Sequence, residues 1–206
     1  MEIHEKLFLA PLTDLVCSLP PVRANRQRIV PRAEGVVLEP GMGSGLNLPF
    51  YDPGRVRHVI GVDPSAALLE KAKARARDAA VDVEFLGISA EELPLEDASV
   101  DTVVLTYTGC SIPDIGRALG EFRRVLKPSG RLLFCEHGRS HEPRVARLQD
   151  MATPLWRGLA GGCHLNRDIE GLLTESGFDV IACERFYAMP RPKVLAYHYL
   201  GAARPK

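Results

Sequence analysis

Short apolar runs recur between residues 36 and 136, and segments with helical spacing separate them. Five runs predict buried strands, at residues 36–38, 58–62, 81–86, 100–106 and 131–136. Helices are expected at 66–79 and 114–126, where apolar residues recur every three or four positions. Strands that alternate with helices predict an α/β fold, in which a parallel sheet has helices on both faces.

The pattern changes after residue 136. Residues 143–159 and 168–176 have helical spacing, and the first of these segments contains Pro154. Two further strands are expected at 178–187 and 194–200. No repeat, low-complexity tract or linker interrupts the chain, so residues 1–206 are expected to form one domain.

The first 34 residues precede the first predicted strand. Residues 3–19 are compatible with an amphipathic helix, and four arginines follow it, at positions 23, 26, 28 and 32. One interpretation is a helix packed on the domain with a solvated basic face. The other is a lid over the active site that also touches anionic lipid through residues 3–32. The apolar stretch at 7–19 is shorter than the roughly 20 residues of a spanning helix.

Charge and cysteine content narrow the functional classes. Lys plus Arg and Asp plus Glu both number 26, so no global basic field exists to hold nucleic acid. The five cysteines are odd in number and form no CxxC pair, which argues against a disulfide framework and against structural zinc. This pattern favours a reducing, cytoplasmic location.

The turn from Glu39 to Gly45 carries the first candidate chemistry. Its sequence, Glu-Pro-Gly-Met-Gly-Ser-Gly, lies between a predicted strand and a predicted helix. Dinucleotide-binding turns have the spacing G-x-G-x-x-G, whereas this turn has G-x-G-x-G. The carboxylate of Glu39 would repel a pyrophosphate. It would suit a cofactor that carries an amino group and a sulfonium charge.

A second carboxylate, Asp63, ends the next predicted strand, 24 positions after Glu39. A carboxylate at this place can accept hydrogen bonds from both hydroxyls of an adenosine ribose. The alternative is a turn or capping role before Pro64. Ser65 is the expected N-cap of the following helix.

These motifs together resemble a known family. The segments E-P-G-M-G-S-G, V-D-P-S, A-E-E-L-P, S-V-D-T-V-V-L and R-R-V-L-K-P-S-G are similar to class I S-adenosylmethionine-dependent methyltransferases of the methyltransferase type 11 kind. A closer resemblance, in T-G-C-S, F-C-E-H and W-R-G-L-A-G-G-C-H-L-N-R, is to animal methyltransferase-like proteins that methylate small thiols and to their bacterial relatives. The sequence departs from these proteins in having no long N-terminal hydrophobic anchor, and it has Ser89-Ala90 where the wider fold often has Asp-Ala.

The resemblance implies a doubly wound, mostly parallel seven-stranded sheet with an antiparallel C-terminal strand. It divides the chain into an N-terminal helical lid (1–34), a cofactor-binding half (35–137) and an acceptor-side segment with closing strands (138–206). The implied cofactor is S-adenosyl-L-methionine. Its expected contacts are Glu39, Gly41, Met42, Gly43, Gly45, Asn47, Asp63, Pro64, Ser65, Ser89, Ala90, Glu91 and Thr106.

Methyl transfer from a sulfonium is an in-line displacement that needs alignment more than a strong base. The candidate catalytic residues are His137, Tyr107 and Cys110, and His137 has a buried structural role as its alternative. Trp156, Cys163, His164 and Arg167 are expected to contact a small-molecule acceptor. No metal site is predicted, because Cys110 is distant in sequence from Cys163-His164.

Three classes of function remain open at this point. The first is methylation of a thiol or a similar soft nucleophile. The second is methylation of a phospholipid such as phosphatidylethanolamine, or of a quinone. The third is a non-catalytic module that binds S-adenosylmethionine, and an NAD-dependent dehydrogenase is disfavoured by the glycine spacing. The sequence gives no prediction of the oligomeric state.

Overall fold

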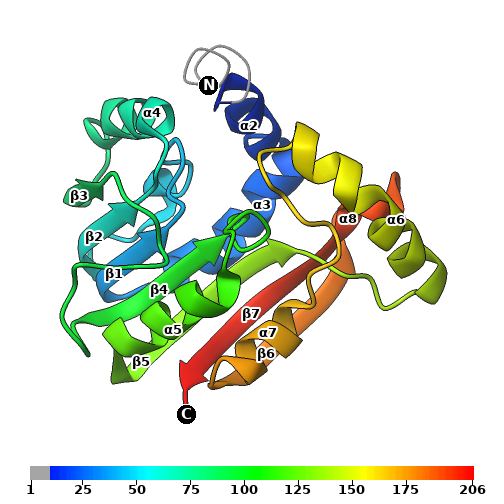
Figure 1. Cartoon of the computed structure of the whole chain (residues 1–206). Helices are drawn as coiled ribbons and strands as arrows, with labels where there is room; N and C mark the ends of the chain where they lie inside the picture. Colours follow the sequence, from blue (N-terminus) through cyan, green and yellow to red (C-terminus); the bar gives the residue numbers. More distant parts are fainter. Residues whose placement is uncertain (1–9) are drawn as a thin grey trace.

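The computed structural model describes residues 10–206, and in these residues seven strands form a single sheet (Figure 1). The strand order is β3-β2-β1-β4-β5-β7-β6. Strands β1 to β5 are parallel, and β7 runs antiparallel to both β5 and β6. The predicted fold class is confirmed. The strand bounds are β1 Gly35–Pro40, β2 Val56–Val62, β3 Val83–Leu86, β4 Val100–Thr106, β5 Leu126–His137, β6 Phe178–Tyr187 and β7 Tyr197–Pro205.

Helices cover both faces of the sheet, as the buried strands require. On one face, α5 (Ile115–Val125) and α7 (Ile169–Glu175) pack Leu119, Phe122 and Leu173 against the strands. On the other face, α3 (Pro20–Ile29) and α4 (Ala66–Ala76) contribute Ile29 and Ala72 to a second core. The central strands are therefore buried from both sides, which explains their continuous runs of Val and Leu.

The N-terminal region contains two described helices instead of one long helix. The first is α2 (Ala10–Cys17), and the part of the predicted helix before residue 10 lies outside the described residues. The second, α3, begins at Pro20, where the sequence had predicted an end. Proline is favoured in the first helical turn because it has no N–H to satisfy. A short 3₁₀ helix, η2 (Val30–Arg32), leads into β1.

Three further local predictions were wrong. The glycine turn is followed by a 3₁₀ turn, η3 (Leu48–Phe50), and not by an α-helix, because Pro49 and Pro53 interrupt the helical hydrogen bonds. Strand β5 begins at Leu126, so residues 127–130 lie within the strand that follows α5. The segment from Lys193 to Ala196 is a helical turn, α8, before β7.

The long helix α6 (Pro143–Leu159) has the predicted bounds and includes Pro154. Among residues 10–206, no helix combines the length and the hydropathy that crossing a bilayer would require. Strand β1 lies between β2 and β4, so the strand order reverses on either side of it. Open α/β sheets bind ligands in the crevice beyond the carboxyl ends of the strands at such a point.

Candidate functional site

The glycine turn occupies this crevice. Gly41, Gly43 and Gly45 all have positive φ angles, of 62°, 58° and 79°, which glycine adopts without steric cost. A Cβ at Gly41 would lie 2.0 Å from the Thr108 side chain, so this glycine is required for packing. A Cβ at Gly43 would meet only the Gly41 carbonyl, at 3.9 Å. The backbone at Gly43 therefore has room to approach a ligand.

The carboxylate of Glu39, just before this turn, is enclosed by protein donors. Its Oε1 accepts a hydrogen bond from Asn47 Nδ2 at 2.9 Å, and its Oε2 accepts one from the Tyr51 hydroxyl at 2.6 Å. Burial raises the pKa of Glu39 to about 7, while the Tyr51 hydroxyl and the charge of Arg26 act in the opposite direction. Because both oxygens are occupied, Glu39 influences the crevice through its charge and by holding Asn47.

Arg26 of α3 is the main residue that sequence reasoning missed. Its guanidinium donates to Asn47 Oδ1 at 2.7 Å and to Thr106 Oγ1 at 2.8 Å, and it lies 5.1 Å from the centre of the Tyr107 ring. The side chain is only 6% exposed, and its Nε has no hydrogen-bond partner. A buried donor without an acceptor indicates a place for an anionic or polar ligand group.

The prediction of a solvated basic face on this segment was wrong for Arg26 alone, because Arg23, Arg28 and Arg32 are exposed. Arg26 is buried, Arg23 stacks on the Phe50 ring, and Arg28 pairs with Glu184 of β6. Arg32 is exposed. The sequence pattern did not distinguish Arg26 from the other three, because its partners Asn47 and Thr106 lie in distant parts of the chain.

Asp63 connects the glycine turn to the start of α4. One carboxylate oxygen accepts from the Gly43 N–H at 2.9 Å, and the other accepts from the Ser65 N–H at 2.8 Å. The turn role foreseen before Pro64 is thus present, and Asp63 also lines the crevice. The predicted N-cap is confirmed, because Ser65 Oγ accepts from the Leu68 N–H at 3.3 Å.

A cavity opens between the glycine turn, the end of β4 and helix α2. Of the predicted site residues, it is lined by Gly41, Met42, Gly43, Asp63, Thr106 and Tyr107. Sequence reasoning did not assign Asp14, Cys17, Arg26, Ser44, Leu46, Leu68, Thr108 and Ser111, which also line it. Asn47 and Glu39 lie behind this lining and form its buried support.

Helix α2 is fixed over the cavity by one carboxylate. Asp14 accepts a hydrogen bond from Ser44 Oγ at 2.5 Å and pairs with Lys71 and Arg75 of α4 at 3.3 and 3.0 Å. Burial would raise the pKa of Asp14, but Ser44 and the two cations together hold it below its ordinary value. Helix α2 therefore closes one side of the cavity.

The turn at residues 89–91, which was expected to contact the cofactor, makes its hydrogen bonds to protein partners. Glu91 accepts from the Ser89 hydroxyl at 2.6 Å and from the Asp114 N–H at 2.6 Å, at the start of α5. Ala90 is buried. None of residues 89–91 is among those that line the cavity.

Tyr107 follows β4 and has a strained backbone, with a φ of 57°. Its hydroxyl accepts from Asn25 Nδ2 at 3.0 Å and lies 3.4 Å from Cys135 Sγ. Burial raises the pKa of Tyr107 far above its ordinary value, so the phenol stays protonated. Tyr107 can shape the cavity and donate a hydrogen bond, but it cannot act as a base at neutral pH.

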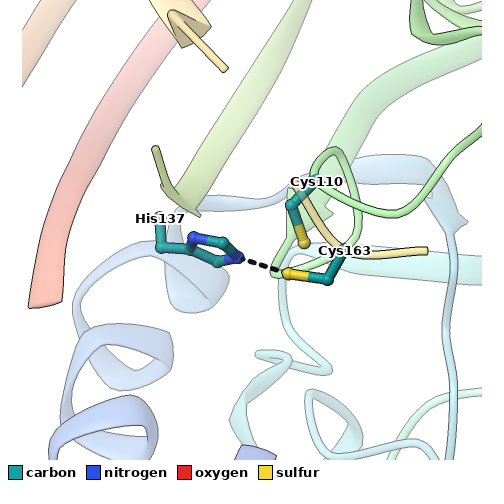
Figure 2. A group of neighbouring side chains, drawn as sticks. All are labelled: Cys110, His137 and Cys163. Atoms are coloured by element: carbon teal, nitrogen blue, oxygen red, sulfur yellow. Dashed lines mark hydrogen bonds between the residues drawn. The ribbon is translucent and has the colours of Figure 1, made fainter. Parts of the chain in front are cut away.

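Three candidate residues that are distant in sequence come together beyond the end of β4. Figure 2 shows His137, at the end of β5, pointing toward Cys163, with the Cys110 sulfur beside it. His137 Nε2 and Cys163 Sγ are 3.2 Å apart, and the ligand atoms of all three residues lie within 4.8 Å of one another. No metal site was predicted, because Cys110 and Cys163 are far apart in the sequence. The fold brings the two residues together, so this reason no longer applies.

The cluster is strongly polarised. A hydrogen bond from the Cys110 thiol, together with His137, lowers the pKa of Cys163 to about 4 against the effect of burial. Burial alone would lower the pKa of His137, but the hydrogen bond and the charge of Cys163 raise it. The hydrogen bond between the two side chains therefore favours the thiolate form of Cys163 and the protonated form of His137.

The cluster adjoins the cavity. Burial raises the pKa of Cys17, which lines the cavity, and the charges of Glu136 and Cys163 add to this rise. Ser111, one residue after Cys110, also lines the cavity. The cluster therefore lies beside the cavity, although none of its three residues lines it.

The acceptor-side segment is docked on the turn after β4. His164 donates its backbone N–H to the Cys110 carbonyl at 2.8 Å, and Arg167 donates to the carbonyls of Gly109 and Ile112. Arg167 thus holds the turn after β4 against the acceptor-side segment through these hydrogen bonds. Trp156 has a buried indole nitrogen, and its N–H contributes to the lowering of the pKa of Cys163.

Comparisons with known proteins agree with this geometry. A family model described as a methyltransferase domain matches residues 38–134. The chain is 34% identical over 155 residues to thiol S-methyltransferase TMT1B of Rattus norvegicus, a match that covers 73% of this chain and 63% of the relative. It is 31% identical over 171 residues to thiol S-methyltransferase TMT1A of Homo sapiens, covering 78% of this chain and 69% of the relative.

Two further matches are to a quinone-pathway C-methyltransferase and to a solved structure of low sequence identity. The ubiquinone/menaquinone biosynthesis C-methyltransferase UbiE of Brucella anthropi is 38% identical over 99 residues, which are 47% of this chain and 38% of that protein. A possible histamine N-methyltransferase of Thermotoga maritima has a TM-score of 0.68 at 21% identity, with full coverage of both chains. This last likeness shows the fold alone.

Proposed function

Because the chain belongs to the class I S-adenosylmethionine-dependent methyltransferase family, we propose that it transfers a methyl group from S-adenosylmethionine to a small thiol. The observation that carries the acceptor assignment is the match to the thiol S-methyltransferase of Rattus norvegicus at 34% identity. The match covers 63% of that relative, so the acceptor is a proposal about this chain.

The residues around the cavity fit the cofactor. Gly43 offers an open backbone, Asp63 offers a carboxylate for ribose hydroxyls, and Arg26 offers a buried donor for the carboxylate of the amino-acid part. When bound, S-adenosylmethionine supplies a methyl group on a sulfonium, which is already activated by its positive charge. Above its pKa of about 7, the enclosed carboxylate of Glu39 favours a cation in this region.

The remaining task of the protein is to position the acceptor and to exclude water. Helix α2 covers the cavity through Asp14, and the segment 163–167 closes on the turn after β4. A small thiol has a pKa of about 8.5, so a few per cent is thiolate at neutral pH and no dedicated base is needed. An amine held as ammonium would need a base, and the neutral Tyr107 cannot provide one.

The test is transfer of labelled methyl from S-adenosylmethionine to sulfide, a small alkyl thiol, a quinol and phosphatidylethanolamine vesicles. Label on a thiol is expected. The variant Asp63→Ala should lose the transfer, whereas Asp179→Ala, at an exposed pair with Arg204, should keep it. Binding of S-adenosylhomocysteine without label on any thiol would refute the acceptor assignment and leave the family assignment intact.

A quinol is the second candidate acceptor. The match to the quinone C-methyltransferase of Brucella anthropi supports it, and so do the exposed apolar side chains of α2, Leu12, Leu15 and Val16. An apolar acceptor would reach the cavity past this helix. Label on the quinol and not on a thiol would favour this candidate.

We also propose a reducing compartment such as the cytoplasm. The five cysteines are odd in number, form no CxxC pair and are all free. A reducing environment keeps thiols in this state.

A further inference from the structure

We propose that Cys110, His137 and Cys163 form a zinc site with one open coordination position, and that the acceptor thiol binds there as the fourth ligand. The second half of this inference rests on the proposed thiol methylation. The first half stands on the geometry of the cluster alone.

The ligand types and separations fit zinc. Two thiolates and one imidazole are a frequent ligand set for this ion, and catalytic sites use three protein ligands and keep the fourth position open. Bonds of about 2.3 Å to sulfur and about 2.0 Å to nitrogen place tetrahedral ligand atoms about 3.5–3.8 Å apart. The three ligand atoms here lie within 4.8 Å of one another, and the His137–Cys163 pair is at 3.2 Å. Side-chain movements of less than about 1 Å would complete the site.

The three ligands come from separate elements that the fold holds firmly in place. Cys110 lies in the turn after β4, where Glu136 accepts from the Gly109 N–H at 3.0 Å. His137 ends β5 and pairs in the sheet with His198 of β7. Cys163 precedes His164, whose N–H is bound to the Cys110 carbonyl. The ligand positions are thus fixed by backbone contacts that do not depend on an ion.

The site lies where an acceptor is needed. Tyr107, Thr108 and Ser111 line the cavity and belong to the same turn as Cys110. A nucleophile bound at the cluster would therefore approach the cavity from the acceptor side. Thiolate ligands are soft and match zinc better than oxygen ligands do.

The step balances without an added oxidant or reductant. On binding, the acceptor thiol loses its proton to solvent and becomes a zinc-bound thiolate. Its sulfur forms a bond to the methyl carbon while the sulfonium carbon–sulfur bond breaks, and that electron pair stays on the sulfur of S-adenosylhomocysteine. The product thioether is neutral and is a weaker ligand than the thiolate, so it leaves and a new thiol takes its place.

The first measurement is the zinc content of the full chain, purified under reducing conditions without chelators. About one zinc per chain is expected for a single site. Cys110→Ser and Cys163→Ser should each lose most of the zinc, whereas Cys183→Ser, a half-buried cysteine on β6 outside the cluster, should keep it. A thermal shift by S-adenosylhomocysteine in every variant would show that each one is folded.

The second measurement replaces zinc with cobalt(II) and follows its absorption spectrum. The wild type should show the intense visible bands of a tetrahedral ion, and a small alkyl thiol added without cofactor should change the sulfur-to-cobalt bands. Absence of metal in the wild type after reconstitution, equal metal in the cluster variants, or a disulfide between Cys110 and Cys163 would overturn the site. A spectrum that the thiol does not change would overturn the open position.

Methyl transfer separates this inference from the proposed function. Zinc-loaded enzyme should methylate the thiol at least tenfold faster than chelator-treated enzyme, a difference of about 1.4 kcal/mol in the barrier. Equal rates would refute a role for the metal while the thiol methyltransferase assignment survives. Thiol binding at the cobalt without transfer to any thiol would refute the catalytic role of the site and the proposed function together.

Discussion

Arg26→Met replaces a buried guanidinium by an apolar side chain of similar length. The change removes the hydrogen bonds to Asn47 at 2.7 Å and to Thr106 at 2.8 Å. Hydrogen bonds from a charged donor contribute about 1.5–3 kcal/mol each. Part of this loss is offset, because the variant no longer buries a charge. We therefore expect the free energy of unfolding to fall by about 2 kcal/mol near pH 5.5, where Glu39 is protonated.

The loss should grow as the pH rises. The folded pKa of Glu39 is raised to about 7 from an ordinary 4.5, mainly by burial. In the wild type, stability therefore falls between these two values, since the unfolded carboxyl releases its proton first. The charge of Arg26 limits this rise. Without it the pKa of Glu39 moves higher, and each further unit costs about 1.4 kcal/mol above that pKa.

Urea unfolding near pH 5.5 and near pH 8.5 tests this reasoning. The penalty of Arg26→Met should be greater at the higher pH by about 1–2 kcal/mol. In the background of Glu39→Gln this extra penalty should vanish, because no carboxylate remains to be compensated. The control Arg28→Met, at an exposed pair with Glu184, should cost less than about 1 kcal/mol at both pH values. An equal penalty for Arg26→Met at both pH values would refute the coupling to Glu39.

The other predictions concern the cofactor side of the cavity. Asp63→Asn should weaken S-adenosylhomocysteine binding by roughly 1–3 kcal/mol in calorimetry, and unchanged affinity would show that the ribose carboxylate is misassigned. Gly43→Ala should reduce this affinity more than it reduces stability, whereas Gly41→Ala, whose Cβ meets Thr108, should mainly lower the melting temperature; similar effects of the two would contradict the separate roles. Asp14→Ala should accelerate amide exchange in residues 10–17, and unaltered exchange would mean that Asp14 does not fix α2.

The strands were predictable because their burial is encoded locally. Residues 100–106 are nearly continuous in Val and Leu, and β4 has these bounds. The start of β5 was not predictable in the same way, because Leu126 pairs with Val100, an irregularity follows, and regular pairing with β4 resumes at Arg131. A helix was also expected after the glycine turn, and Pro49 excludes it.

The candidate site likewise contains residues that the local sequence identifies and residues that only the tertiary fold brings together. The glycine turn and Asp63 carry their geometry in a few consecutive residues, so the sequence pointed to them directly. Arg26 and Asp14 belong to the cavity only because α2 and α3 fold over it, and nothing in their local sequence distinguishes them from surface charges. Cys110 and Cys163 meet across more than fifty residues, which is why sequence separation was a misleading guide.

One wall of the site is therefore expected to contact the cofactor, and the opposite wall to contact the methyl acceptor. The wall built from the glycine turn and Asp63 consists of backbone and short side chains, which suit one invariant ligand. The opposite wall comes from α2, α3 and the segment 163–167, which are held by a few side chains such as Asp14 and Arg167. Changes in these segments would alter the acceptor while leaving the cofactor side intact. Acceptor specificity is thus expected to reside in Cys17 and in the Cys110–His137–Cys163 cluster, where the second wall meets the cavity.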